Sequence, residues 1–364
     1  MLKVNTVNGR ICAQEVNRML IHEHLLIDMT HEAIPPSDEL ALNLYHGKVK
    51  KENIEELRRN PYIIRDNLVL DDVDVAVAEL DAAKQEGVNV IVDLTTVGLK
   101  RDAVRLRQIS DALKVHIIAG CGLFVHDSLP DAYLSWSVEK IAAWMISDIE
   151  IGIDGTDIKA GIIGEIGTSE KIYPIEEKSL HAAALTYGAT GLSIMVHIYP
   201  WSEAGLNAAQ LLLSEGVPPG KICICHVDVS FNERFMHELL DLGVYIEFDD
   251  FGKEFEFEPQ KGAFAGGSFE TDQKRVQMLS HLCNAGYTSQ IMLANDVCTK
   301  SLLRAYGGNG YVHLFSNIIP MMRDAQIDDA VIQTLLHENP IRFLFDDLHG
   351  EKANCPAAET AGLM

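Results

Sequence analysis

The chain has 364 residues, of which 47% are hydrophobic and 23% are charged, enough for one large α/β barrel or two ordinary domains. Its formal net charge of −23 argues against partners that need a basic surface, namely nucleic acid or an anionic membrane. The chain does not open on a basic segment followed by an apolar core, and no apolar run reaches roughly 18 residues, so we expect neither a signal peptide nor a membrane span.

The seven cysteines are an odd number with irregular spacing, and several fall in apolar, strand-like runs. This pattern is typical of reduced thiols in a cytoplasm and not of a disulfide framework. Cys223 and Cys225 form a C-x-C pair, which also occurs in soft-metal sites. If the adjacent His226 faces a site, strand alternation turns both cysteines toward the covering helices.

Alternating residues on both sides of Asn8-Gly9 predict a β-hairpin within residues 2–16. The apolar run 19–27 predicts the first strand of the main fold. The polar segment 28–72 is too long for a simple connection, so we expect it to contain short helices that lie over a site.

From residue 72 onward, helical patterns alternate with short apolar runs. These runs are nearly continuous in apolar residues, as expected when both faces of a parallel sheet are buried. Helices are predicted at 73–85, 102–113, 137–149, 176–187, 204–215, 232–242, 272–285, 311–324 and 327–337. Strands are predicted at 88–94, 115–120, 160–167, 192–198, 222–229, 244–248 and 290–294.

With the run at 19–27, eight strands alternate with helices, which predicts a (β/α)8 TIM barrel with an N-terminal β-hairpin and long strand-end loops. An open, doubly wound sheet is the alternative, but no glycine-rich dinucleotide motif follows the first strand. We expect residues 1–347 to form a single barrel domain. Residues 348–364 are small and polar, and we expect a disordered tail or an oligomer arm.

In TIM barrels the active site lies at the C-terminal ends of the strands. His22 and His24 are two residues apart, so a strand would point both to one face. Glu165 is a charge within a buried strand, which is costly unless it is paired or bound to a metal. Together the strand ends supply four histidines and two carboxylates, which are His22, His24, Glu165, His197, His226 and Asp296.

Any one of these histidines is more often structural than catalytic, but the whole set predicts a metal centre. One catalytic zinc needs about three protein ligands and a water. Six ligands suit two divalent ions roughly 3.5–4 Å apart that share a bridging carboxylate and a hydroxide. Asp228 and Asp250, which follow two of the strands, are expected to orient ligands.

With these residues in place, the sequence resembles the phosphotriesterase family of the amidohydrolase superfamily. The resemblance is strongest to its phosphotriesterase-related branch, some members of which are called resiniferatoxin-binding proteins. It extends from Val4 to about Phe345. The motifs that carry it are Thr6-Val7-Asn8-Gly9, His22-Glu23-His24, residues 160–167, Ala294-Asn295-Asp296, residues 306–311 and Glu338-Asn339-Pro340.

The resemblance implies two divalent metal ions per chain, with zinc as the expected metal. It puts His22, His24 and Asp296 on the more buried ion, and His197 and His226 on the more exposed ion, with Glu165 as the bridge.

Two departures argue against organophosphate hydrolysis as the native reaction. True phosphotriesterases bridge their metals with a carboxylated lysine, where this chain has Glu165. They also keep a proton-relaying histidine on strand seven, where this chain has Phe248-Asp249-Asp250-Phe251.

We expect metal-assisted hydrolysis in which Asp296 takes the proton of the attacking hydroxide and gives it to the leaving group. The family implies cleavage of a carboxyl ester or lactone. The resemblance leaves three alternatives open: an amidase for small N-acyl compounds such as N-acyl amino acids or N-acyltaurine, phosphotriesterase activity only as a side reaction, and a non-enzymatic binder of a resiniferatoxin-like molecule.

The strand-end loops should select a small-molecule substrate. The loop 252–272, which contains Phe255, is expected to be a mobile lid. The family is often dimeric and apolar patches permit a homodimer, and we expect a cytoplasmic location.

Four basic residues near strand ends are candidates for binding an anionic substrate group, although each also suits an ion pair within this acidic chain: Lys100, Arg101, Arg275 and Lys300.

Overall fold

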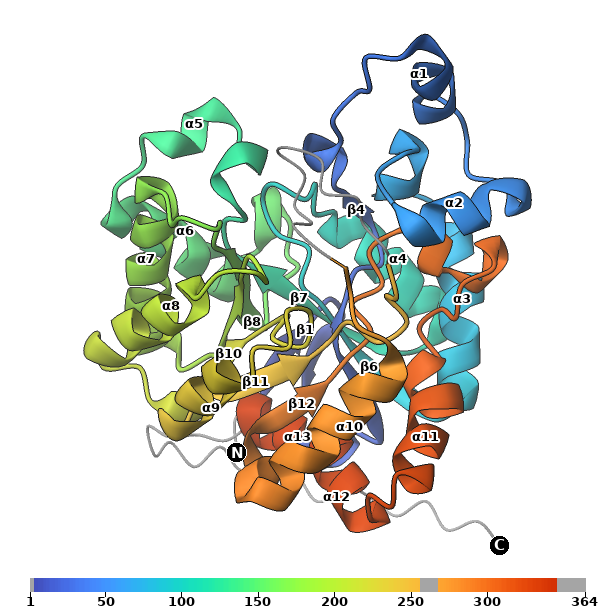
Figure 1. Cartoon of the computed structure of the whole chain (residues 1–364). Helices are drawn as coiled ribbons and strands as arrows, with labels where there is room; N and C mark the ends of the chain where they lie inside the picture. Colours follow the sequence, from blue (N-terminus) through green and yellow to red (C-terminus); the bar gives the residue numbers. More distant parts are fainter. Residues whose placement is uncertain (1–2, 256–267, 346–364) are drawn as a thin grey trace, which may run out of the picture.

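The centre of the computed structural model is a sheet of eight parallel strands surrounded by helices (Figure 1). The structure describes residues 3–255 and 268–345, so most of the predicted lid and all of the predicted tail lie outside the described residues. The strand order is β12-β11-β10-β9-β8-β7-β6-β3, so neighbours in the sheet follow one another in the sequence. The strands are β3 (Arg18–Glu23), β6 (Val88–Asp93), β7 (His116–Cys121), β8 (Ile162–Gly167), β9 (Ile194–His197), β10 (Ile222–Ile224), β11 (Tyr245–Phe248) and β12 (Ile291–Leu293).

The two edges of this sheet meet. The backbone N–H of Asp296, just after β12, donates a hydrogen bond to the carbonyl oxygen of His22 in β3 at 3.3 Å. The sheet therefore closes, and the predicted TIM barrel is confirmed.

Helices alternate with the strands as predicted. No helix in the described part of the chain is long and apolar enough to cross a membrane. The helix α13 was not predicted; it continues directly from a π-helical turn at Thr334–Glu338, and Pro340 stands just after that turn. The helices are α1 (Glu39–Tyr45), α2 (Ile54–Arg59), α3 (Val73–Gln85), α4 (Ala103–Leu113), α5 (Asp131–Leu134), α6 (Val138–Glu150), α7 (Pro174–Thr190), α8 (Ala204–Ser214), α9 (Glu233–Asp241), α10 (Asp272–Leu282), α11 (Ile319–Asp324), α12 (Asp329–Gln333) and α13 (Asn339–Phe345).

Successive residues of each barrel strand pack on opposite faces. Val92, Ile118 and Met195 belong to a cluster that takes residues from all eight strands and fills the barrel. Ile91 and Ile117 belong to a second cluster that includes the covering helices. Burial on both faces explains the nearly continuous apolar runs in the sequence.

Cys223 and Cys225 are part of the cluster inside the barrel, so the prediction that they face the covering helices is wrong. The prediction assumed regular alternation up to His226. However, β10 ends at Ile224, and His226 has a φ of +60°, outside the extended region. Strand alternation therefore does not relate the direction of His226 to that of the two cysteines.

Five cysteines in the described part of the chain form no disulfide. Cys12, just after the N-terminal hairpin, is an exception because it is disulfide-bonded. The free cysteines among the described residues are Cys121, Cys223, Cys225, Cys283 and Cys298.

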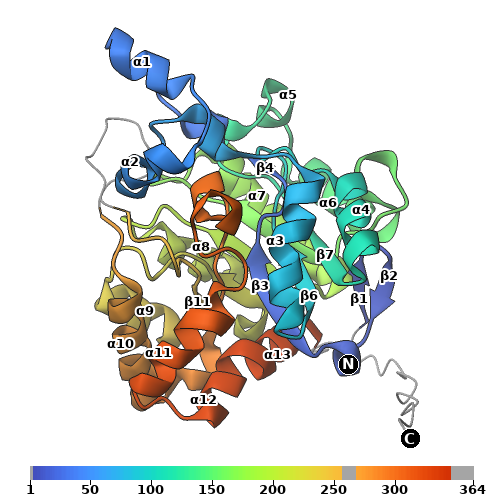
Figure 2. The same cartoon turned by 90° about the vertical axis from the view of Figure 1, so that its right-hand side faces the viewer.

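The run predicted as one strand at 19–27 forms two strands. After β3, the N–H of Leu25 donates to the side chain of Asp93 at 2.8 Å. The chain then enters β4 (Ile27–Asp28), which pairs antiparallel with β5 (Val69–Leu70). Between β4 and β5, the short helices α1 and α2 project from one end of the barrel, which confirms the prediction of short helices in this segment (Figure 2).

The predicted hairpin is formed by β1 (Val4–Thr6) and β2 (Gly9–Ile11). Thr6 pairs with Gly9, so the turn residues are Val7 and Asn8. Gly9 has a φ of +123°, which glycine adopts without strain. The side-chain amide of Asn5 donates to the carbonyl oxygen of Ala160, just before β8, at 2.8 Å. The hairpin therefore lies at the N-terminal end of the strands, opposite the predicted site.

Candidate active site

The six residues predicted as metal ligands lie together at the C-terminal end of the barrel. Each side chain is buried, with at most 5% of the residue exposed. They come from the ends of β3, β8, β9, β10 and β12, as the sequence pattern indicated.

Glu165 lies at the centre of this group. Its Oε1 is 3.0 Å from Nδ1 of His197 and 2.9 Å from Nε2 of His226. Nε2 of His22 and Nε2 of His24 each lie 3.8 Å from one of its two carboxylate oxygens. Burial opposes ionisation, but the neighbouring histidines outweigh it and hold the pKa of Glu165 well below its usual range. One carboxylate therefore touches both pairs of histidines, as a bridging ligand must.

Two glycines allow the strands on either side of β8 to lie close to its backbone beside Glu165. Gly164, just before Glu165, has a φ of +134°, and a Cβ there would lie 2.6 Å from the carbonyl oxygen of Met195 in β9. A Cβ on Gly120 in β7 would lie 2.0 Å from the carbonyl oxygen of Gly164. Both neighbouring strands thus approach Glu165 more closely than a side chain would permit.

His22, His24 and Asp296 form a second part of the site. Nε2 of His22 is buried without a hydrogen-bond partner among the described residues, and it lies 3.8 Å from Oδ1 of Asp296. That oxygen is 3.1 Å from Nε2 of His24. Ligand atoms of the three residues all lie within 4.8 Å of one another, and so do those of His22, Glu165 and His226. Because ligand atoms around a tetrahedral zinc are roughly 3.3 Å apart, these residues fit divalent ions.

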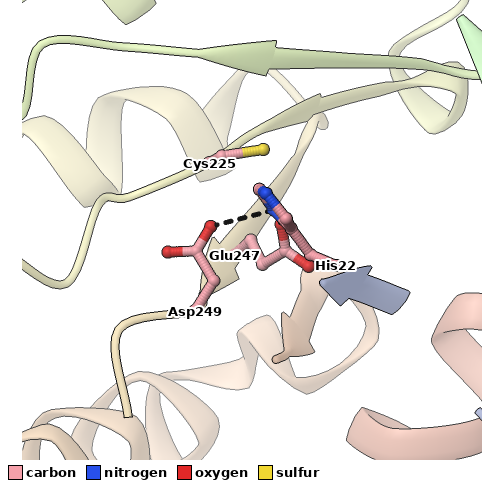
Figure 3. Close-up of side chains that lie close together, drawn as sticks. All are labelled: His22, Cys225, Glu247 and Asp249. Atoms are coloured by element: carbon pink, nitrogen blue, oxygen red, sulfur yellow. Dashed lines mark hydrogen bonds and ion pairs between the residues drawn. The ribbon is translucent and has the colours of Figure 1, made fainter. Parts of the chain in front are cut away.

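The far sides of two histidine rings are held by carboxylates on and after β11. Nδ1 of His22 lies 2.8 Å from Glu247 and 3.3 Å from Asp249, and both carboxylates surround this ring together with Cys225 (Figure 3). The same Asp249 oxygen lies 3.1 Å from Nδ1 of His226. A proton on each Nδ1 leaves each Nε2 free to face Glu165. Burial lowers the pKa of both histidines, but the carboxylates outweigh it and raise it.

The sequence pattern pointed to Asp228 and Asp250 for this orienting role, and it missed Glu247 and Asp249. Asp228 instead accepts backbone N–H groups from Asp249 and Asp250. Asp250 comes no closer to Nδ1 of His226 than 3.9 Å. A signal for Glu247 was present, because a charge inside an apolar strand is as costly there as at Glu165.

Lys253, in the loop after β11, was also missed. It is 5% exposed, and its ammonium forms ion pairs with Oδ2 of Asp296 and, at 2.8 Å, with Asp250. Burial opposes ionisation of Asp296, but Lys253 outweighs it and lowers the pKa of that carboxyl. Since Lys253 occupies Oδ2, Oδ1 of Asp296 is left facing His24.

Glu23 stands between the two histidines in the sequence but binds elsewhere. One of its oxygens accepts from the side-chain amide of Asn295 at 2.8 Å, and the other accepts from the N–H of Val297 at 2.9 Å. These contacts flank Asp296, whose φ is +45°. Glu23 therefore fixes the backbone that carries Asp296 instead of adding a ligand.

A cavity of about 60 Å³ opens from these ligands. Its walls are mostly apolar, and they include Met29, Leu99 and Phe124. The segment after β4 adds Glu32 and Tyr62, whose hydroxyl donates to Glu32 at 2.8 Å. Burial raises the pKa of Glu32 to about 7. The segment 28–72 thus forms one wall of the site, as predicted.

None of the four basic residues proposed for substrate binding is among the described residues that line this cavity, whereas Lys253 is. All four are in ion pairs instead. Lys100 pairs with Asp28, Arg101 with Asp148 and Asp154, Arg275 with Asp228 and Asp272, and Lys300 with Asp66.

The model of the Phosphotriesterase family matches residues 2–344 of the chain. A phosphotriesterase-related protein of Nematostella vectensis is 34% identical over 343 residues, which cover 93% of this chain and 97% of that protein. An N-acetyltaurine hydrolase of Rattus norvegicus is 34% identical over 349 residues, which cover 94% of this chain and 97% of that protein.

Two solved structures share the fold. A resiniferatoxin-binding protein from Rhodobacter sphaeroides superposes with a TM-score of 0.90 at 33% identity, covering 94% of each chain. A phosphotriesterase homology protein from Escherichia coli, complexed with phosphate in its active site, superposes with a TM-score of 0.75 at 30% identity. That match covers 90% of this chain and 99% of the other.

We predict that Arg275→Met lowers the free energy of unfolding by about 3–5 kcal/mol, because it leaves the buried Asp228 carboxylate without its cation and removes one of the partners of Asp272. Urea unfolding measures this change. The control is Lys274→Met, since Lys274 is 57% exposed and its pair with Glu270 contributes only about 0–1 kcal/mol. Equal, small changes in both variants would contradict a structural role for Arg275.

We predict that Lys253→Met weakens zinc binding about 10- to 100-fold, because Asp296 loses the partner that fixes its orientation. Competition with a chromophoric chelator measures the affinity. Lys253→Arg keeps the charge and the donors, and it should lose less. Unchanged zinc affinity in Lys253→Met would show that Asp296 does not depend on this contact.

Proposed function

Because the chain belongs to the phosphotriesterase family, we propose that it cleaves the amide bond of a small N-acyl compound of the N-acetyltaurine type. Membership of this family supports the general activity, which is metal-dependent hydrolysis. The observation that carries it here is the buried, unpartnered Nε2 of His22, which faces Glu165 and Asp296 at 3.8 Å.

The substrate class rests on the relatives. Several N-acetyltaurine hydrolases of vertebrates align over 94% of this chain at 32–34% identity. Because of these relatives, we prefer an amidase to the carboxyl-ester or lactone hydrolase that was the first expectation from the sequence. Both reactions begin with attack on a carbonyl carbon, but an amine is the poorer leaving group and must be protonated as it departs.

The ligand set supports two bound ions, and the mixture of imidazoles and carboxylates suits zinc. When bound, the ions supply Lewis acidity, which polarises the carbonyl and lowers the pKa of water toward neutrality. We assign His22, His24 and Asp296 to one ion, His197 and His226 to the other, and Glu165 to both.

Asp296 is the proposed acid and base. Its Oδ2 pairs with Lys253 and its Oδ1 faces His24, so the carboxylate stands beside the proposed metal centre and can take a proton from the attacking water. The same group then gives that proton to the amide nitrogen as the C–N bond breaks. Water is consumed, and a carboxylic acid and an amine are released. The apolar cavity wall suits a short acyl chain and limits access of bulk water.

A substrate panel tests the proposal. We expect N-acetyltaurine or an N-acetyl amino acid to give a kcat/KM at least about tenfold above that of a γ-lactone, a carboxyl ester or a phosphotriester. A chelator should abolish the activity, and zinc should restore it. A faster lactone or ester would replace the amidase assignment. Resiniferatoxin binding without any chelator-sensitive hydrolysis would support the binder instead.

We predict that Asp296→Asn lowers kcat about 10²- to 10⁴-fold, because the amide keeps the side-chain shape but cannot accept the proton. Zinc content, measured on the same sample with zinc in excess, should stay close to that of the parent protein, so that the lost turnover is not a loss of metal. Asp324→Asn, on the exposed surface of α11, is the control and should leave kcat unchanged. Near-normal turnover in Asp296→Asn would refute the assigned role.

A further inference from the structure

A second group of potential ligands lies outside the barrel, between two covering helices. Glu233 and His237 are on α9, and His281 is on α10. Figure 2 shows these helices side by side at the periphery of the molecule. Ligand atoms of the three residues all lie within 4.8 Å of one another. We propose that they form a binding site for a divalent transition-metal ion such as zinc, separate from the active site.

The distances between the ligand atoms suit one ion. Oε1 of Glu233 lies 3.0 Å from Nε2 of His281 and 3.7 Å from Nε2 of His237. Zinc bonds of about 2.0–2.1 Å in a tetrahedral site put neighbouring ligand atoms roughly 3.3 Å apart. The two distances from Glu233 lie on either side of this value, and the third pair of ligand atoms, on His237 and His281, lies within 4.8 Å.

The local sequence brings these side chains together. Glu233 and His237 are four residues apart on α9, so they lie one above the other on one helix face. The ring of His237 packs edge-on against Tyr287, with centroids 5.3 Å apart. The Tyr287 hydroxyl in turn donates to Asp241, one turn further along α9, at 2.7 Å. His237 therefore has an aromatic neighbour that limits its rotation before any ion binds, which lowers the cost of forming the site.

The donor types select the class of metal. Calcium and magnesium prefer sites built from oxygen atoms, whereas two imidazoles and a carboxylate suit zinc and its neighbours in the transition series. The side chains of Glu233 and His281 are 51% and 59% exposed, so an ion can enter from solvent. Three protein ligands leave a further position for water.

The consequence of the site is structural. The helix α9 leads into β11 and α10 leads into β12, and these strands carry Asp249 and Asp296 at their ends. An ion bound by both helices would join the outer layer over these two strands. Without an ion, the contacts of Glu233 with the two histidines are partly exposed and contribute little to stability. The bound ion therefore stabilises this side of the barrel and takes no part in hydrolysis.

Zinc titration of the metal-depleted, full-length protein tests the site, with a chromophoric chelator as competitor. We expect His281→Ala and His237→Ala each to bind one zinc equivalent fewer than the parent protein. The parent's Tm should rise further than theirs when zinc exceeds the active-site ions. Turnover of the zinc-loaded variants should match that of the parent, which also shows that they are folded.

The matched control is His181→Ala. Nδ1 of His181 lies 3.0 Å from Glu215, and its side chain is about as exposed as that of His237. Among the described residues, no further histidine joins this pair to make a group of three potential ligands. The His181→Ala variant should bind as many zinc equivalents as the parent protein.

Equal zinc counts in the parent and in both site variants would overturn the proposal. The count is a difference between variants, so it stays interpretable even if the substrate assignment fails.

Discussion

The buried carboxylate of Glu165 is the constraint on which the rest of the site depends. A carboxylate that is 1% exposed cannot keep its charge unless cations or strong donors surround it. Histidines from the ends of β3, β9 and β10 meet this need, and each must come within about 4 Å of the same group. The barrel satisfies this requirement because the ends of its strands converge on one point.

The charges around this point are unbalanced. Carboxylates of Glu165, Glu247, Asp249 and Asp296 gather at the strand ends, where Lys253 is a buried cation that faces one of them. The carboxylates around His22 and His226 raise the pKa of both imidazoles, because a positive charge is favoured at these two positions. Divalent ions would supply the positive charge in place of protons, and the protons would be released when the ions bind. Metal binding would therefore balance the charge of the buried carboxylates.

The sequence was sufficient for the order of strands and helices and for the six residues that gather at the strand ends, because both follow from periodicity and from topology. It was insufficient where the backbone leaves its regular path. His226 adopts a left-handed conformation, so alternation misplaced Cys223 and Cys225. Charge and position near a strand end did not identify Lys253, because its contact with Asp296 joins residues 43 positions apart in the sequence. Arg275 looked like a candidate for substrate binding although it is fully buried, because the sequence does not show its contact with Asp228.

Glu23 links the beginning of the barrel to its end. It lies in the first barrel strand, and its carboxylate accepts hydrogen bonds from the backbone N–H groups of Asn295 and Val297, on either side of Asp296. Asn295 follows Glu23 by 272 residues in the sequence. These contacts cannot form until nearly the whole barrel has been synthesised, because Asn295 and Val297 follow its last strand, β12. A nascent chain therefore carries His22 and His24 for most of its synthesis without a complete site. Metal binding at this centre thus becomes a reporter of barrel closure, and a chain that stops before β12 would have histidines but no enzyme.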